Sequence, residues 1–237
     1  MNQQDIVIKI FEFAILVFAL SLHEAAHAWT ASRLGDQTAR MLGRVTLNPA
    51  KHIDPIGTVL IPLAMLFLPG YGRFLVGWAK PTPVTTRNFK NIRRDDILTT
   101  LAGPASNLLA AIGAMILLVI LAKATPAGGQ VIHEFAMVGS ILADPALMAA
   151  SPVVFPMAAI LYLSVMLNLF LAVFNLLPLP PLDGSHIIRH MLPYNALRIY
   201  DSLGMISLIL MLLVGGPIVG MFVRPAMGLI NGILLSL

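Results

Sequence analysis

Cysteine and charge are both scarce in this sequence of 237 residues: it contains no Cys, and only 11% of its residues are charged. Without thiols the chain can form neither disulfides nor thiolate metal sites, so any metal ligands must be His, Asp, Glu or carbonyl oxygens. A soluble globular domain carries roughly 25% charged residues. The low charge therefore excludes an ordinary soluble protein.

Hydrophobic residues make up 58% of the chain, and the mean hydropathy is +0.86. They concentrate in five runs, at residues 6–22, 56–68, 97–122, 153–177 and 203–235. Because a membrane-spanning helix needs about 20 apolar residues, the pattern predicts an all-α polytopic membrane protein, a helical bundle of about four to six transmembrane segments. We expect one membrane-embedded domain over residues 1–237, with a core at 1–192 and a C-terminal helical segment at 202–237 that is broken near Gly215 and Pro225.

The basic residues indicate the orientation of the chain. Lys and Arg number 15 against 11 Asp and Glu, but they lie in short loops between the apolar runs, so we expect no nucleic-acid binding. By the positive-inside rule, the loops after the first helix, expected at 6–34, and after the helix at 153–177 face the cytoplasm. The first run has no basic leader or cleavage site, so it is expected to remain as a helix in the lipid bilayer.

The second apolar run, 56–68, is too short to cross a bilayer comfortably. Its 13 residues include Pro62, and at about 1.5 Å per residue they reach about 20 Å against a hydrocarbon core of about 30 Å. Basic residues flank it on both sides, which places both flanks in the cytoplasm. We expect a short re-entrant or β-hairpin element near residues 56–85; the alternative is a short, thinly anchored span.

An H-E-x-x-H pattern lies at residues 23–27 of the first helix. At about 3.6 residues per turn, His23 and His27 share one helix face, where both can bind a single ion. Glu24 projects about 100° away, where a general base can reach a water at an open coordination position. Ionisable groups in an apolar helix are costly unless paired or metal-bound, so they indicate function. The alternative is a helix end that already lies among the headgroups.

A catalytic zinc takes three protein ligands and leaves the fourth position for water. Asp183 is the best candidate for the third ligand, because it follows the helix at 153–177 and so lies at the same cytoplasmic end as His23 and His27. His186 could be a rival ligand or a partner of the ligands, although a place in a plain helical turn is favoured.

Together these motifs resemble those of the site-2 protease family of intramembrane zinc metalloproteases. Residues 175–184 read NLLPLPPLDG, which fits the pattern N-x-x-P-x-P-x-L-D-G and follows H-E-x-x-H in the order of the family. The stretches AGPASN at 102–107, GRVTLNP at 43–49 and GWAKP at 77–81 look like compact prokaryotic members that have no PDZ or CBS domain. The resemblance covers most of residues 18–190 and implies an integral protein of the prokaryotic plasma membrane, with its active site toward the cytoplasm.

The resemblance also implies roles for individual residues. His23, His27 and Asp183 would bind one Zn²⁺ per chain, and Glu24 would be the catalytic base. Asn175 would contact the substrate or the developing oxyanion, and Asn107 is a weaker candidate for a similar contact. For Asn107 an interhelical hydrogen bond is an equally good interpretation, because small residues surround it on its helix.

We therefore expect an enzyme that hydrolyses peptide bonds in or near transmembrane segments of membrane-protein substrates, in regulated intramembrane proteolysis. Residues 74–84 would be an edge strand that pairs with an unwound substrate, or else a plain loop. A metal transporter would need polar sites staggered through the bilayer, and a non-catalytic scaffold would be expected to have lost a ligand or Glu24. The sequence does not identify the substrate or show whether the substrate must first be cleaved elsewhere. It also leaves the oligomeric state open, and a homo-oligomer is one possibility.

Overall fold

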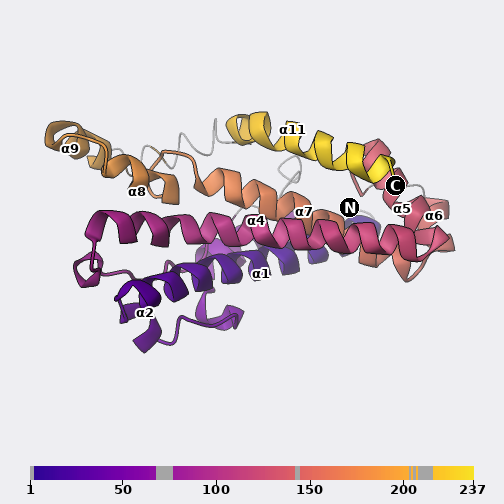
Figure 1. Ribbon diagram of the computed structural model, residues 1–237. Coiled ribbons are helices and arrows are strands. Elements are labelled where there is room, and N and C mark those ends of the chain that lie inside the picture. The colour runs from indigo at the N-terminus through magenta and orange to yellow at the C-terminus, as the bar shows by residue number, and fades with distance from the viewer. Residues whose placement is uncertain (1–2, 68–76, 142–144, 203, 205–206, 208–215) are drawn as a thin grey trace.

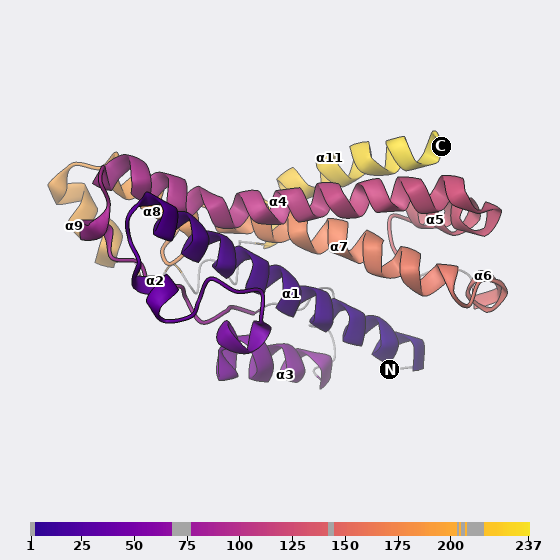
Figure 2. The same cartoon turned by 60° about the horizontal axis from the view of Figure 1, so that its bottom comes forward.

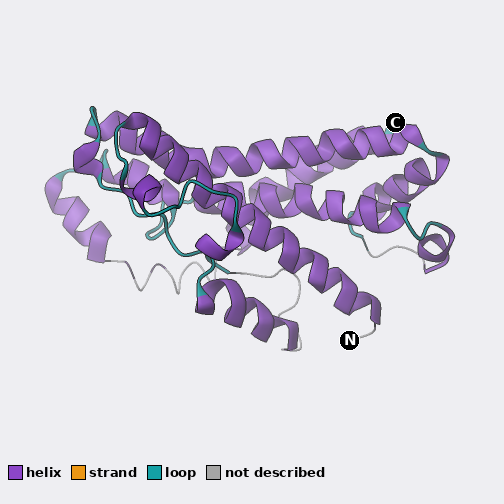
Figure 3. Cartoon of the chain, turned by 90° about the horizontal axis from the view of Figure 1, so that it is seen from below, coloured by secondary structure: helices purple, strands orange, loops and turns teal. Residues whose placement is uncertain are grey.

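The structure is a computed structural model that describes residues 3–67, 77–141, 145–202, 204, 207 and 216–237. In these residues it contains helices and loops and no β-strand (Figure 3). The α-helices are α1 (Gln3–Leu34), α2 (Thr38–Met41), α3 (Ile61–Phe67), α4 (Ile92–Ala124), α5 (Pro126–Val138), α6 (Pro145–Ala150), α7 (Val154–Asn175), α8 (Asp183–Arg189), α9 (Tyr194–Ser202) and α11 (Gly216–Leu235). Two short 3₁₀ helices (Pro49–Lys51 and Thr86–Asn88) and a π-helical turn (Pro55–Leu60) lie in the loops.

Four of the described helices, α1, α4, α7 and α11, are long and apolar enough to cross a membrane. This confirms the prediction of an all-α polytopic membrane protein. The helix α4 runs through the middle of the bundle, with α1 and α7 packed along it and α11 on the outer side against α5 and α7 (Figures 1 and 2). The largest apolar core joins α1, α4, α5, α7 and α11 around the fully buried Phe135 and Tyr162.

Local sequence signals explain the helix ends near the two motifs. The helix α1 ends before Gly35, whose φ of 119° lies in the left-handed region, and a Cβ there would come within 2.9 Å of the Asn88 carbonyl oxygen. Glycine is therefore required at this turn. The helix α4 begins at a capping box: the Asn91 side chain accepts from the Arg94 N–H at 3.1 Å, and the Asp95 carboxylate accepts from the Asn91 N–H at 2.9 Å.

The β-hairpin expected near residues 56–85 is not confirmed. The π-helical turn at Pro55–Leu60 leads directly into α3, which lies beside α1 (Figure 2). Residues 77–85 have no strand assignment, and the part of the expected strand at 74–76 lies outside the described residues. Pro62 stands within a helix here, and the apolar helix Pro55–Met65 is shorter than the four candidate spans. The β-hairpin finds no support in the described residues, and the re-entrant path stays a prediction.

The C-terminal helix differs from the broken segment that the sequence predicted. The helix α11 runs from Gly216 to Leu235 without a break at Pro225. A proline removes one backbone N–H, but a helix surrounded by lipid keeps its other internal hydrogen bonds because it has no water to replace them. The expected interruption at Pro225 is therefore wrong, whereas the one at Gly215 lies outside the described residues.

Candidate metal centre

Three side chains from distant parts of the chain converge where α1, α4 and α8 meet. The His23 Nε2 atom lies 3.0 Å from the His27 Nε2 atom and 3.0 Å from Asp183 Oδ2, and His27 Nε2 lies 3.4 Å from Asp183 Oδ1. The structure thus brings together the three residues that the motifs single out.

The orientation of His27 is set by a backbone carbonyl of α4. Its Nδ1 atom lies 2.7 Å from the Thr99 carbonyl oxygen, which can only accept a hydrogen bond, so Nδ1 carries the proton and donates. In a neutral imidazole the Nε2 atom then has a free lone pair, and it points at the cluster.

The orientation of His23 depends on a chain of amides. Asn107 is fully buried, and its Nδ2 donates to the Ala19 carbonyl at 3.3 Å and to Asn168 Oδ1 at 2.9 Å. Asn168 in turn donates to the Ser164 carbonyl at 2.9 Å. These carbonyls fix which end of each amide is nitrogen, so Asn107 Oδ1 faces His23 and accepts from its Nδ1 at 2.7 Å. His23 therefore also presents a free Nε2 lone pair to the cluster.

This arrangement of atoms fits a bound cation. Two Nε2 lone pairs that face each other at 3.0 Å repel unless a cation lies between them. The Asp183 Oδ2 atom is buried and has no hydrogen-bond partner within the described structure, although His23 Nε2 is close by. Two imidazoles and a carboxylate form a ligand set that zinc takes in catalytic sites, with one position left open.

A glycine makes room for such an ion. A Cβ at Gly103 of α4 would lie 2.4 Å from His27 Nε2 and 2.6 Å from His23 Nε2, so it would occupy the space on which the two lone pairs converge. The bare Cα of Gly103 keeps this space open. Gly103 and Asn107 are one turn apart on α4, so this helix supplies the opening and the orienting amide from the same face.

The helix that carries Asp183 is tied to α4 by a second cluster. His190 Nε2 lies 2.7 Å from Asp96 Oδ2, and His186 Nδ1 lies 3.6 Å from the same oxygen. His186 therefore faces Asp96, as a partner of the helix that holds a ligand and not as a rival ligand. The neighbouring Gly184 is required for close packing, because a Cβ there would come within 2.2 Å of the Leu176 carbonyl oxygen.

Glu24 lies between the two histidines in sequence, and it is held by a different partner. Its Oε2 atom accepts a hydrogen bond from the Thr82 N–H at 2.7 Å, and its backbone carbonyl accepts from Thr82 Oγ1 at 3.0 Å. Glu24 is half-buried, so its carboxylate is not sealed off from solvent or substrate. Glu24 is not among the residues whose ligand atoms converge, and its role as a base stays a prediction.

Asn175 and Asn107 differ in how many of their side-chain atoms are used in hydrogen bonds within the protein. Asn175 is the last residue of α7, and its Nδ2 donates to the Leu171 carbonyl at 3.0 Å, which leaves the side-chain oxygen available. Asn107 uses both ends of its amide within the protein. These contacts favour the interhelical interpretation of Asn107, whereas the contact of Asn175 with substrate stays a prediction.

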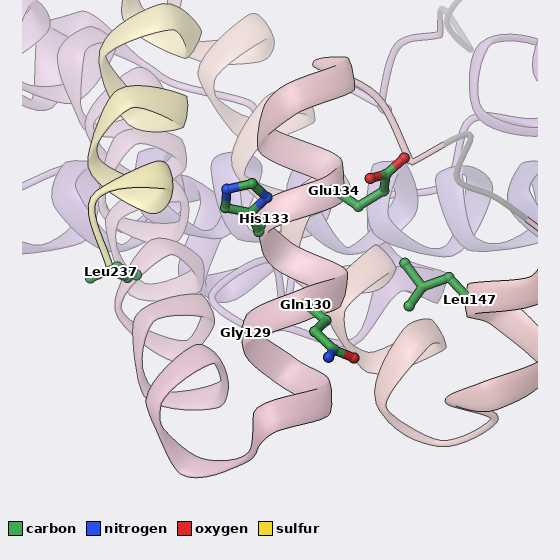
Figure 4. Close-up of a pocket in the computed structure, with 6 residues that line it drawn as sticks. All are labelled: Gly129, Gln130, His133, Glu134, Leu147 and Leu237. Carbon is green, nitrogen blue, oxygen red and sulfur yellow. The ribbon is translucent and has the colours of Figure 1, made fainter.

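A hollow lies at the other end of the bundle, away from this cluster. It measures about 600 Å³ and is lined by Gly129, Gln130, His133, Glu134, Leu147 and Leu237. His133 and Glu134 project to opposite sides of α5 (Figure 4), so the hollow has no converging ligand set. Among the described residues, His133 belongs to no group of converging metal ligands.

Sequence reasoning missed Thr82, Gly103 and Asp96. Of these, Thr82 had a readable signal, because it stands between Pro81 and Pro83 and is the one residue of that tripeptide with a backbone N–H. Gly103 and Asp96 matter through contacts that join α4 to other helices, and such contacts are set by tertiary packing.

Known proteins are similar to this chain over most of its length. The model of the family described as Peptidase family M50 matches residues 11–214. A Bacillus subtilis protein named "Putative zinc metalloprotease YwhC" is 39% identical over 178 residues, which cover 75% of this chain and 67% of that protein. Two mycobacterial proteins named "Putative zinc metalloprotease Rip2" are also similar. The Mycolicibacterium smegmatis protein is 33% identical over 40% of this chain and 35% of its own length. The Mycobacterium tuberculosis protein is 32% identical over 70% of this chain and 51% of its own length. No solved structure matches at a significant level.

Proposed function

This chain belongs to peptidase family M50, a zinc metalloprotease family, and on that premise we propose that it hydrolyses peptide bonds in or near transmembrane segments of other membrane proteins. The observation that carries the proposal is the convergence of His23, His27 and Asp183, with the far nitrogen of each imidazole fixed by a partner in α4. His23, His27 and Asp183 are assigned as the ligands of one zinc ion per chain. Family membership favours this hydrolase over a metal transporter or a non-catalytic scaffold.

The roles of the protein side chains follow from their chemistry. When bound, zinc polarises a carbonyl oxygen and lowers the pKa of water to about 7. Glu24 accepts the proton of the attacking water and delivers it to the departing amine, because its carboxylate lies beside the ligands and has a free oxygen. Asn175 donates to the developing oxyanion or to the substrate backbone, since a neutral amide can donate and accept.

A transmembrane substrate has to unwind before it reaches this site, and residues 77–85 offer it partners. The N–H groups of Trp78, Lys80 and Thr82 donate to one side, to the Gly57 carbonyl, the His52 carbonyl and Glu24. In an extended segment the alternate residues present their backbone groups to the opposite side. We assign the opposite edge, where Ala79 carries both backbone groups and Pro81 and Pro83 offer no N–H, as the place where an unwound substrate pairs with the segment, which satisfies backbone groups that lipid cannot.

We also assign the catalytic end of the bundle to the cytoplasmic side of a prokaryotic plasma membrane. The support is the charge pattern: Arg40, Arg44 and Lys51 follow α1, and Arg87 and Lys90 precede α4. Single cysteines in place of Arg40 and Lys90 should both react with an impermeant thiol reagent from the cytoplasmic side, and one at Gln130 from the outer side. The chain has no native Cys, so the labelling has no background. Labelling of position 90 from the outside would contradict the re-entrant path of residues 56–85.

The proposed activity is tested by comparing two acids that each follow a histidine. Glu24→Gln keeps the size of the side chain and removes its ability to accept a proton, so cleavage should fall by roughly 10² or more while zinc stays bound. Glu134→Gln makes the same change on α5 and should leave cleavage intact. Proteomics of membrane fractions should show cleavage products in wild type and Glu134→Gln that are absent in Glu24→Gln. Identical products in all three would refute the role of Glu24.

A further inference from the structure

Thr82 contacts Glu24 in two ways that no other described residue duplicates. Its N–H donates to the carboxylate oxygen Oε2 at 2.7 Å, and its hydroxyl donates to the Glu24 carbonyl at 3.0 Å. A hydrogen bond to an ionised acceptor at this distance is among the strong ones in proteins. One carboxylate oxygen of Glu24 is therefore fixed, while the other remains for a proton.

The sequence around Thr82 restricts its backbone on both sides. Pro81 and Pro83 have fixed φ angles and no N–H, and the residue before each proline is held near extended geometry. The Thr82 N–H is thus the single backbone donor of this tripeptide, and it points at Glu24. A rigid segment that presents one donor loses little conformational freedom when that donor binds.

This segment is itself anchored to the loops around it. The buried Arg44 guanidinium donates to the carbonyl oxygens of Lys80 and Pro81, at 3.0 and 2.8 Å, and the Lys80 N–H donates to the His52 carbonyl at 2.8 Å. Both hydrogen bonds come from the Nη2 atom, which carries two N–H groups. Arg44 therefore sets the position of the backbone that reaches Glu24.

We propose that Thr82 is a positioning residue: its N–H holds Glu24 Oε2, so that Oε1 is presented to the water that Glu24 deprotonates. This rests on the proposed role of Glu24 as the base and adds how the base is aimed. The same segment 77–85 carries the edge assigned to the substrate, so the base and the substrate are aligned by one piece of backbone. The alternative is that Thr82 only packs the loop against α1.

Amide hydrogen exchange tests the contact without any activity measurement. Because Pro81 and Pro83 lack amide hydrogens, a peptide across residues 80–84 isolates the Thr82 amide from its nearest neighbours. In Glu24→Ala this amide should exchange at least about tenfold faster than in wild type, since a hydrogen bond to a charged group is lost. In Glu24→Gln it should stay slow, because a carboxamide oxygen still accepts.

An amide a few residues away serves as the control. The Thr85 N–H donates to Asp36 Oδ2 at 2.7 Å, so its exchange should be unchanged in Glu24→Ala and should respond to Asp36→Ala instead. If the Thr82 and Thr85 amides both exchanged faster in Glu24→Ala, the loop as a whole would have loosened, and this would contradict a specific contact between Thr82 and Glu24. Equal exchange of Thr82 in wild type and Glu24→Ala would also overturn the proposal.

Substitutions of Thr82 itself separate its backbone from its side chain. Thr82→Ala keeps the N–H and should lower kcat less than Thr82→Pro, which removes the N–H and should lower kcat by roughly tenfold or more, with KM and zinc content unchanged. Arg44→Met should lie between them, since it removes both hydrogen bonds to the segment. Wild-type kcat in Thr82→Pro would refute the positioning role. Slow exchange of Thr82 together with full activity of Glu24→Gln would instead refute the base and leave the contact standing.

Discussion

The chain contains the dipeptide His-Glu twice, and the two copies differ in almost everything but sequence. His23 and Glu24 lie at one end of the bundle, where His23 is buried, bonded to Asn107 and directed at His27 and Asp183. His133 and Glu134 lie on α5 at the other end, where His133 is exposed and the two side chains diverge (Figure 4).

The difference shows what turns these residue types into a site. At the first end three groups each have a partner that fixes their direction: a carbonyl for His27, an amide for His23 and a backbone N–H for Glu24. At the second end the hollow that His133 and Glu134 line has no converging set of ligands. Outer partners that orient metal ligands are part of a metal site, so predictions that break them should separate the two ends.

The largest effect is expected from closing the space beside the histidines. Gly103→Ala would place a Cβ 2.4 Å from His27 Nε2, so purified protein should lose its zinc and with it all cleavage. Gly113→Ala is the matched control on the same helix, because a Cβ there meets no atom within 4 Å. Zinc content by elemental mass spectrometry checks both variants. Normal zinc in Gly103→Ala would show that the ion does not occupy this space.

Loss of Asn175 should reduce the rate and spare the metal. Asn175→Ala should lower turnover by about 10² to 10³, the scale for removing one donor to an oxyanion, with zinc retained. If Asn175 only packs the end of α7, the melting temperature should fall and turnover per molecule should stay. Melting temperature, zinc content and cleavage measured on one preparation decide between these roles, with the exposed Asn195→Ala as the control.

A smaller loss is expected when His23 loses its orienting partner. Asn107→Ala should weaken zinc binding by about 10- to 100-fold, as is typical when a partner of a metal ligand is removed. Asn231→Ala breaks a comparable hydrogen bond to Tyr162, of 3.0 Å, within the core shared by α5, α7 and α11 and should leave zinc affinity unchanged. Titration with a competing chelator measures both. Equal zinc affinity in the two variants would remove Asn107 from the metal centre.

The smallest effect concerns the loops around the catalytic end. Burial alone would raise the pKa of Asp36, but hydrogen bonds from Thr38, Thr85 and Asn88 hold it below 3.8. The ionised Asp36 therefore stabilises the folded state at pH values above the pKa of this group in the unfolded chain. This stabilisation is lost as the pH falls through the lower pKa of the folded state. Asp36→Asn should therefore cost about 1.5–3 kcal/mol at neutral pH and flatten the loss of stability below about pH 4.

The exposed pair Arg189–Asp201 provides the control for Asp36. Its distance of 3.1 Å is normal for an ion pair, but Asp201→Asn should cost at most about 1 kcal/mol because both side chains are solvated. Thermal melts of both variants between pH 3 and pH 8 test the contrast. Equal losses would mean that the buried network around Asp36 adds nothing to stability.

Most of the fold was predictable because the bilayer leaves a strong signal in composition. The helices at 6–34, 97–122 and 153–177 were expected from long apolar runs, and they correspond to α1, α4 and α7. The expected break at Pro225 failed because proline rules come from water-exposed helices, whereas α11 has no water with which to replace its backbone bonds. The β-hairpin near 56–85 is not confirmed: residues 55–67 fold as a π-helical turn and α3, and residues 77–85 contain no strand.

The candidate site, like the fold, was predictable only in part from the sequence. His23, Glu24, His27 and Asp183 were found because spacing on a helix and placement at one membrane side are properties of the sequence. Gly103, Thr82 and the Thr99 carbonyl were not found, because their roles depend on distances of a few ångströms between segments more than 50 residues apart. A backbone carbonyl in particular leaves no mark on residue type.

The central claim is that the first His-Glu copy, completed by His27 and Asp183, holds the metal. The most direct measurement is the zinc content of three purified proteins: wild type, the double variant His23→Ala/Asp183→Ala and the double variant His133→Ala/Glu134→Ala. We predict about one zinc per chain in wild type and in the second double variant, and none above background in the first, as a three-ligand site requires. Undiminished zinc in His23→Ala/Asp183→Ala, or its loss in His133→Ala/Glu134→Ala, would contradict the claim.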